Sequence, residues 1–352
     1  MSLKRDLGRA RYAAAQGARV AWYLGQYMLA RRISGPFNRP GEPQFQPQAA
    51  EGDSQRIRTA FLDLFAKDRA NIEAGLYPAP DDVRAGAAFD ALKSSARFFR
   101  DLPHVDRRRL QRAGVEVRKT GESDGRYPAY YLQNFHYQTG GWLTEDSAKL
   151  YDTQVEILFG GAADAMRRVA LGSLARALKG RDQRGVKLID LACGNGRFLR
   201  QVMAAFPRIP ATGLDLSPAY CAEARSRLAD WRQVEIVNGA VEQAPFEDES
   251  FDAATCVYLF HELPPRVRRE AAREIARVLK PGGVFVLADS IQTGDHADLD
   301  RMLEYFPVGF HEPYFGSYLK EDFPALFAEF GLEVEETELA FLTKVTRLRK
   351  RA

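Results

Sequence analysis

Cysteine is scarce in this chain of 352 residues, and no long apolar run is present. Its three cysteines, Cys193, Cys221 and Cys256, are odd in number and lack the spacing of metal ligands. We therefore expect free thiols in a reducing, cytoplasmic compartment, with neither a disulfide framework nor a metal site. No run reaches the ~18 apolar residues of a membrane span. An A-x-A cleavage pattern after an apolar core is also missing, so we expect no signal peptide.

An excess of charge is missing as well, because the formal net charge is only +3. This charge is uneven: residues 1–50 carry eight Lys or Arg against Asp6 and Glu42, which gives them about +6 and the remainder about −3. Residues 3–33 predict a basic helix that bears Trp22 and Tyr27. We expect it to dock on its own protein or on a second copy, as in a homodimer. Peripheral attachment to a membrane surface is the alternative, and nucleic-acid binding is a third.

Residues 186–196 read V-K-L-I-D-L-A-C-G-N-G and predict a strand followed by a glycine turn. The short apolar run 186–189 ends at Asp190, Gly194 and Gly196 turn the chain, and helical spacing resumes at Arg197. Such a turn directs backbone N–H groups and a helix N-terminus at a ligand above the strand end, and glycines let that ligand approach closely. The pattern therefore predicts a site for a nucleotide-like cofactor.

The third glycine of a dinucleotide fingerprint is absent, because Leu199 stands at its position. Asp190 suits a cationic ligand better than a pyrophosphate. The stretch resembles the first motif of the class I S-adenosylmethionine-dependent methyltransferases, in which this loop wraps the methionine part of the cofactor. One departure is Ala192, which stands where the family commonly has its first glycine.

Two further runs extend the resemblance. Residues 211–214 lead to Asp215, at a strand end where ligands of open α/β sheets bind, and Ser217 with Pro218 begins a helix. In the family, the carboxylate at the position of Asp215 holds the two ribose hydroxyls. Residues 234–246 resemble the adenine-side loop. Ala240 replaces its usual aspartate, so adenine recognition is left to the backbone N–H of Val241 or to Glu242.

Residues 279–289, L-K-P-G-G-V-F-V-L-A-D, resemble the end of the sheet in the ubiquinone-biosynthesis-like branch of this family. The resemblance covers residues 186–289. It implies an α/β fold with a Rossmann-like seven-stranded sheet, mostly parallel with one antiparallel strand, and an N-terminal helical cap. We expect a basic helix and irregular connector at 1–52, a helical cap or substrate lid at 53–180, and the cofactor-binding domain at 181–352.

Several local expectations accompany this division. Helices are predicted at 54–74 and 83–100, the second ending before Pro103, and again from Thr144 and at 162–179. The basic tail 347–351 is expected to be solvated.

The resemblance also assigns residues to the cofactor. These are Asp190, Ala192, Cys193, Gly194, Arg197, Asp215, Leu216, Ala240, Val241, Val257 and Tyr258.

Two stretches rich in aromatic and histidine residues are candidates for the acceptor site. They are the first aromatic loop, residues 127–142, and the second aromatic loop, residues 306–319. Rings with polar tips suit a pocket wall, and structural docking of helices on the sheet is equally open. His261, just past the fourth strand, is the candidate general base, because a pKa near 6.5 suits proton removal. The second choices are His136 and His311, with Tyr137, Tyr258, Glu262 and Tyr314 as residues that could orient the acceptor.

Two substrate classes are disfavoured. The segment after the fourth strand, Tyr258 to His261, is not the Asn/Asp-Pro-Pro-aromatic segment of enzymes that methylate exocyclic amines. The cofactor domain also lacks a basic stripe interleaved with aromatics, so no specific nucleic-acid partner is expected. We therefore expect direct in-line methyl transfer to a small apolar or aromatic molecule.

Two other functions stay open. One is a non-catalytic S-adenosylmethionine-binding protein, a membrane-associated assembly or regulatory factor, which Ala192 and Ala240 favour. The other is a nicotinamide-dependent Rossmann enzyme, which the missing third glycine disfavours.

Overall fold

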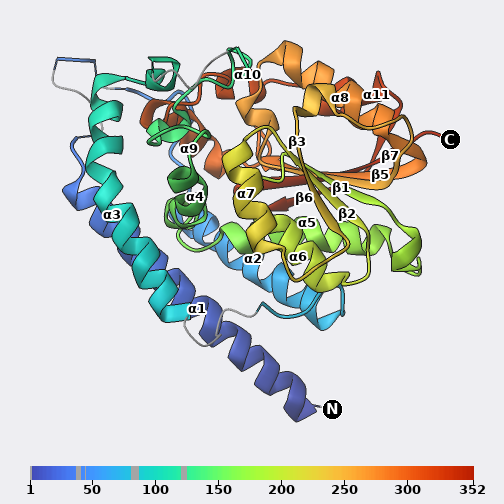
Figure 1. The fold of residues 1–352 in the computed structure, drawn as a ribbon. Coiled ribbons are helices and arrows are strands. Elements are labelled where there is room, and N and C mark those ends of the chain that lie inside the picture. The colour runs from blue at the N-terminus through green and yellow to red at the C-terminus, as the bar shows by residue number, and fades with distance from the viewer. Residues whose placement is uncertain (1, 37–40, 44, 81–86, 120–124) are drawn as a thin grey trace.

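A single seven-stranded sheet organises the computed structural model, which describes residues 2–36, 41–43, 45–80, 87–119 and 125–352 (Figure 1). The strand order is β3-β2-β1-β4-β5-β7-β6. The strands are β1 Leu188–Leu191, β2 Ala211–Asp215, β3 Val234–Asn238, β4 Phe251–Val257, β5 Leu279–Ser290, β6 Leu332–Ala340 and β7 Thr343–Lys350. Neighbouring strands from β3 to β5 are parallel, and β7 is antiparallel to both β5 and β6. The expected fold class is confirmed.

Helices cover both faces of this sheet. They are α1 Ser2–Ile33, α2 Ser54–Glu73, α3 Ala87–Gln111, α4 Glu145–Leu158, α5 Ala163–Ala177, α6 Arg197–Ala205, α7 Pro218–Arg227, α8 Pro265–Val278, α9 Ala297–Gly309, α10 Phe315–Tyr318 and α11 Phe323–Ala328. Leu188 of β1 packs in the cluster beneath α5 and α6, whereas Ile189 and Leu191 pack in the cluster beneath α8 and α11. This alternation is the period of two of a strand buried on both faces.

Helix α5 lies in the layer against the sheet, although it precedes the first strand. Every residue from 163 to 175 is buried, and the helix contacts β5 and β7 on one side and α2 on the other. A helix buried all round belongs to a core rather than to a mobile lid. Within the range 53–180, α5 therefore supports the sheet, and the first aromatic loop and α4 lie nearer to the strand ends.

Two local expectations about helices differ from the structure. Helix α3 continues through Pro103 to Gln111, so the predicted helix end is wrong. Packing of α3 against α1 and α4 offsets the lost backbone hydrogen bond, which costs about 3 kcal/mol. The second aromatic loop is partly helical, because α9 extends to Gly309. The start predicted at residue 83 lies outside the described residues.

The basic tail is also not free in solution. Residues 343–350 form β7, and Arg347 pairs with Glu335 at 2.9 Å and with Glu336 at 2.6 Å on the neighbouring strand. Acidic residues on β6 therefore convert a run of like charges into cross-strand ion pairs.

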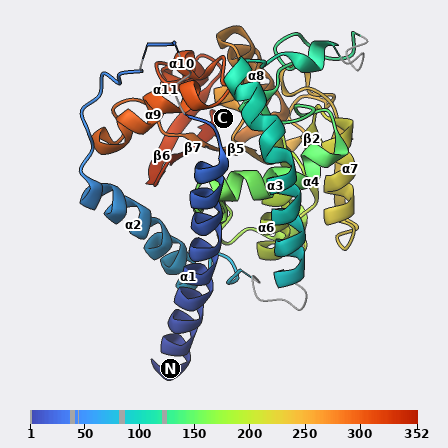
Figure 2. The same cartoon turned by 90° about the vertical axis from the view of Figure 1, so that its left-hand side faces the viewer.

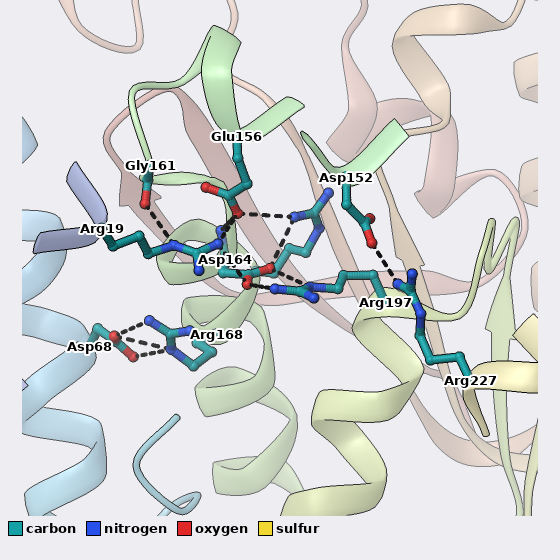
Figure 3. Close-up of polar contacts among 10 residues, drawn as sticks. Arg19, Asp68, Asp152, Glu156, Gly161, Asp164, Arg168, Arg197 and Arg227 are labelled. Atoms are coloured by element: carbon teal, nitrogen blue, oxygen red, sulfur yellow. Dashed lines mark hydrogen bonds and ion pairs between the residues drawn. The ribbon is translucent and has the colours of Figure 1, made fainter. Parts of the chain in front are cut away.

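Helix α1 docks on its own chain along α2, α3 and α4, while its N-terminal end extends beyond the rest of the molecule (Figure 2). Arg19 reaches into the protein and pairs with Glu156 at 2.7 Å and with Asp164 at 3.0 Å (Figure 3). The guanidinium of Arg197 binds the same Asp164 carboxylate, with Nε 3.0 Å from Oδ1. Burial alone raises the pKa of Asp164, but Arg197 and Arg19 override burial and hold that pKa well below its usual range.

A second buried ion pair fixes α2 on α5. The carboxylate of Asp68 accepts hydrogen bonds from Arg168, at 2.7 Å from the terminal nitrogen and 2.9 Å from Nε. It also accepts hydrogen bonds from the hydroxyls of Tyr12 at 2.6 Å and Tyr77 at 2.8 Å. Four donors on one fully buried carboxylate join α1, α2, α5 and the loop after α2.

Replacing Asp68 with alanine is expected to lower the free energy of unfolding by about 3–5 kcal/mol, because it leaves the buried Arg168 without a counter-charge. Urea unfolding followed by circular dichroism measures the change. Asp63→Ala, on the exposed side of the same helix, is the control and is expected to shift stability by less than about 0.5 kcal/mol. Equal losses in the two variants would contradict the assignment of Asp68 as the anchor of α2.

Candidate active site

The carboxyl ends of β1, β2 and β4 open into a cavity, here called the strand-end cavity. The turn after β1 adopts left-handed backbone conformations at Ala192 (φ 55°), Gly194 (φ 57°) and Gly196 (φ 77°). A β-carbon at Gly196 would lie 3.1–3.2 Å from Leu228 and Ala224, so glycine is required for both conformation and space. Alanine at 192 holds a conformation that disfavours L-residues, which is a form of strain common at functional sites.

Two strand-end carboxylates face this cavity. Asp215 accepts hydrogen bonds from the backbone N–H of Gly194 at 2.8 Å and of Ser217 at 2.9 Å, one on each oxygen. Asp190 accepts one from the hydroxyl of Thr255 at 2.6 Å. Burial raises the pKa of Asp190 to about 7 and that of Asp215 to about 6. The protein therefore provides too few hydrogen-bond donors or cations to stabilise the ionised form of either acid. A ligand that carries hydroxyl groups or a positive charge would supply them.

All eleven residues assigned to the cofactor line the strand-end cavity. They are Asp190, Ala192, Cys193, Gly194, Arg197, Asp215, Leu216, Ala240, Val241, Val257 and Tyr258. The guanidinium of Arg197 is engaged by Asp164, so its charge is already balanced within the protein. Tyr258 has φ 60°, its hydroxyl lies 2.7 Å from the hydroxyl of Thr343, and Arg167 stacks over its ring at 5.6 Å.

The first aromatic loop forms the opposite wall. Its Trp142 ring packs edge-on against Tyr151 at 5.3 Å and Tyr220 at 5.8 Å. The backbone carbonyl of Trp142 accepts the hydroxyl of Ser217 at 2.6 Å, and the hydroxyl of Tyr130 donates to Glu242 beside the adenine-side loop. The rings of this loop therefore line the strand-end cavity, and its hydrogen bonds hold it against the sheet.

A second and larger cavity, here called the helical cavity, lies between α1, α3 and α4 beside the end of α9. It has a volume of about 420 Å³, within the range that holds small organic ligands. Tyr151 lines both cavities, and His136 and Tyr137 line the helical one. These last two residues have φ of 53° and 56°, so two more strained positions lie at the site.

Charged side chains from three segments gather between the cavities. His261 Nδ1 lies 2.6 Å from Asp289 Oδ1 at the end of β5, and Glu262 accepts a hydrogen bond from Trp142 Nε1 at 3.0 Å. His136 Nε2 lies 3.3 Å from Glu312 Oε1, so the two aromatic loops meet here. Burial raises the pKa of Glu262 to about 7 and that of Glu312 well above its usual range.

None of the three candidate histidines keeps the ordinary histidine pKa near 6.5 that was expected from the sequence. Burial lowers the pKa of His261, but Asp289 overrides burial and raises it to about 9. Burial and the nearby His261 lower the pKa of His136 to about 3. His311 pairs with Gln133 at 2.8 Å, and burial lowers its pKa. The contact with Asp289 therefore favours the protonated ring of His261, and a catalytic role for His261 stays a prediction.

Sequence reasoning gave no role to Asp289, Glu312 or Tyr151. Asp289 ends the strand run L-A-D, so it follows the same strand-end pattern that identified Asp190 and Asp215. Glu312 and Tyr151 carried no comparable signal, because their positions depend on how loops and helices meet.

Comparison with known proteins independently supports the resemblance to methyltransferases. Residues 188–283, about a quarter of the chain, match the family model described as a methyltransferase domain. The ubiquinone/menaquinone biosynthesis C-methyltransferase UbiE of Methylobacterium nodulans is 32% identical over 162 residues, which are 45% of this chain and 62% of that protein. The demethylmenaquinone methyltransferase of Staphylococcus aureus is 32% identical over 111 residues, 31% of this chain and 45% of that protein. The chain thus spans less than two thirds of the length of these curated relatives.

Among solved structures, the carbon methyltransferase CurJ aligns over 98% of this chain and 94% of its own, with 13% identity and a TM-score of 0.48. The family match falls on the strands and turns that build the strand-end cavity. The chain thus carries a methyltransferase domain of the class I S-adenosylmethionine-dependent type, matched at residues 188–283.

Proposed function

We propose that this chain transfers a methyl group from S-adenosylmethionine to a small aromatic acceptor whose apolar part occupies the helical cavity. The observation that carries the proposal is the arrangement of the two cavities, which share Tyr151 and meet at the charged cluster around Glu262. The strand-end cavity lies at the carboxyl ends of the strands of a methyltransferase sheet, and the helical cavity is large and mainly apolar. A direct transfer requires two such sites side by side.

The side chains that line the strand-end cavity suit S-adenosylmethionine, which supplies a methyl group already activated on a sulfonium. Asp215 keeps lone pairs available on both oxygens after accepting one backbone N–H on each, so it can accept the two ribose hydroxyls. Asp190 offers a buried carboxylate to the cationic end. Gly239, Ala240 and Val241 line the adenine side with small or apolar side chains.

An aromatic acceptor suits the rings and the charges around the helical cavity. Neither His261, held protonated, nor His136, held neutral by burial, has a pKa suited to removing a proton from a weak acid near pH 7. Hydroquinones and naphthols ionise more readily than aliphatic alcohols, so they place less demand on a protein base. The names of the relatives, which refer to ubiquinone, menaquinone and demethylmenaquinone, favour the same class.

Contact with a lipid surface is a further part of this proposal. Helix α1 borders the helical cavity through Tyr27, Ala30 and Arg31. Its other side chains include large exposed apolar groups, namely Leu7, Trp22, Leu24, Met28, Leu29 and Ile33. No helix in the described residues is long and apolar enough to cross a membrane. A basic helix with exposed apolar residues can instead lie in the interface and admit an apolar acceptor from it.

Calorimetric titration with S-adenosylhomocysteine tests the cofactor site. Asp215→Ala is expected to weaken binding by roughly 100-fold, since two hydrogen bonds to a charged group contribute about 1.5 kcal/mol or more each. The exposed Asp230→Ala is the control and should bind normally. Affinity of the unaltered protein is expected to fall as pH drops below about 6, because protonation of Asp215 removes acceptor capacity. Binding of NADH alone would contradict the assignment.

Filling the helical cavity tests the acceptor site. Val105→Trp adds a large side chain at the α3 wall and is expected to abolish homocysteine-nucleotide release with naphthol and hydroquinone acceptors while S-adenosylhomocysteine affinity stays within twofold. Leu62→Trp, at an exposed site on α2, is the control. Full turnover of the Val105 variant would place the acceptor elsewhere.

Co-sedimentation with phosphatidylcholine vesicles containing one quarter phosphatidylglycerol tests lipid contact. The double variant Met28→Ser, Leu29→Ser is expected to reduce the bound fraction several-fold, and added salt should reduce binding of the unaltered protein. Leu62→Ser is the control, because Leu62 is equally exposed on α2. Equal sedimentation of all three proteins would remove lipid contact from the account.

A further inference from the structure

Glu312 presents a buried carboxylate that the described protein does not satisfy. Its side chain is fully shielded from solvent, and neither carboxylate oxygen has a hydrogen-bond partner among the described residues. A buried polar group without a partner costs about 1–3 kcal/mol, and more when it is charged. This carboxylate therefore requires an explanation other than its own packing.

Two further side chains of types that bind metal ions, those of His136 and Glu262, lie close to Glu312. Each of the three residues offers one ligand atom, and these three atoms all lie within 4.8 Å of one another. The distance from His136 Nε2 to Glu312 Oε1 is 3.3 Å. Ligand atoms held about 2.1 Å from a metal in tetrahedral or octahedral geometry are about 3.0–3.4 Å apart. The His136 and Glu312 atoms already have that separation, and Glu262 needs only a small side-chain adjustment.

Surrounding residues hold the three side chains in place. The Glu262 carboxylate accepts the Trp142 indole N–H at 3.0 Å through Oε2, and its Oε1 lies 3.8 Å from His261 Nε2. The His136 ring packs edge-on against Phe306 at 5.9 Å and Phe310 at 5.7 Å. Such a supporting shell fixes ligand orientation around metal ions.

The available donors suit a dication. Asp289 already binds His261 at 2.6 Å, so Glu262 and Glu312 are the carboxylates left to bind an ion. Once a bound metal has displaced their protons, these two carboxylates would balance the charge of a divalent ion.

We propose that His136, Glu262 and Glu312 bind one divalent transition-metal ion, Zn²⁺ or Mn²⁺, between the strand-end cavity and the helical cavity. One imidazole and two carboxylates form a mixed donor set that suits these ions better than Mg²⁺, which prefers oxygen alone. Three protein ligands leave a position open, as in catalytic metal sites. That position faces the boundary of the two cavities and would take an acceptor hydroxyl oxygen, a role that rests on the proposed function.

The test uses the full chain, stripped with a chelator and titrated calorimetrically with ZnCl₂, with electron paramagnetic resonance of MnCl₂ as a second readout. One ion per chain is expected to bind with a dissociation constant in the micromolar range or below. Glu312→Gln keeps the shape of the side chain but removes its charge, so affinity should fall at least tenfold. His136→Asn is the second variant, because asparagine tolerates the left-handed backbone at this position.

Glu247→Gln is the matched control, since Glu247 is exposed and lies outside the cluster, and its metal affinity should be unchanged. Two results would overturn the proposal: no binding of either ion at 1 mM, or equal binding in both ligand variants and the unaltered protein. S-adenosylhomocysteine titration of the same samples reports folding and separates the two proposals. Retained nucleotide binding without metal binding contradicts only the metal site, whereas lost nucleotide binding in the unaltered protein contradicts only the proposed function.

Discussion

The carboxylate of Asp164 connects the parts of this protein on which the site depends. It receives Arg19 from the N-terminal helix and Arg197 from the helix that follows the glycine turn (Figure 3). The position of the added helices is thereby coupled to the turn that lines the strand-end cavity. Buried charges of this kind give little net stability by comparison with apolar packing, but removing one partner leaves the others uncompensated. The network consequently fixes geometry more than it adds stability.

This coupling explains how the N-terminal region contributes to a site at the opposite end of the sequence. Helices α1, α3 and α4 enclose the helical cavity, and the first aromatic loop brings its rings between that cavity and the strand ends. The second aromatic loop completes the boundary with Glu312. Strained backbone lines both cavities, at Ala192 and Tyr258 in the strand-end cavity and at His136 and Tyr137 in the helical cavity. Regular structure elsewhere supports these positions.

Sequence reasoning succeeded where function follows from local pattern. Asp190 and Asp215 each end an apolar run, and parallel strands bring such ends to one edge of a sheet. It failed where a property depends on a distant partner. Asp289, 28 residues from His261, raises the pKa of its ring, and the register of β4 and β5 brings the two residues together. Pro103 was expected to end a helix, but packing on two other helices overrides that local rule.

We propose that the methyl donor and the acceptor meet at the boundary of the two cavities. A crystal structure of the chain with S-adenosylhomocysteine tests this most directly. We expect the ribose hydroxyls to lie on Asp215 and the sulfur to be directed past Tyr151 toward the helical cavity. A sulfur directed away from that cavity, or a ribose held elsewhere, would contradict the account.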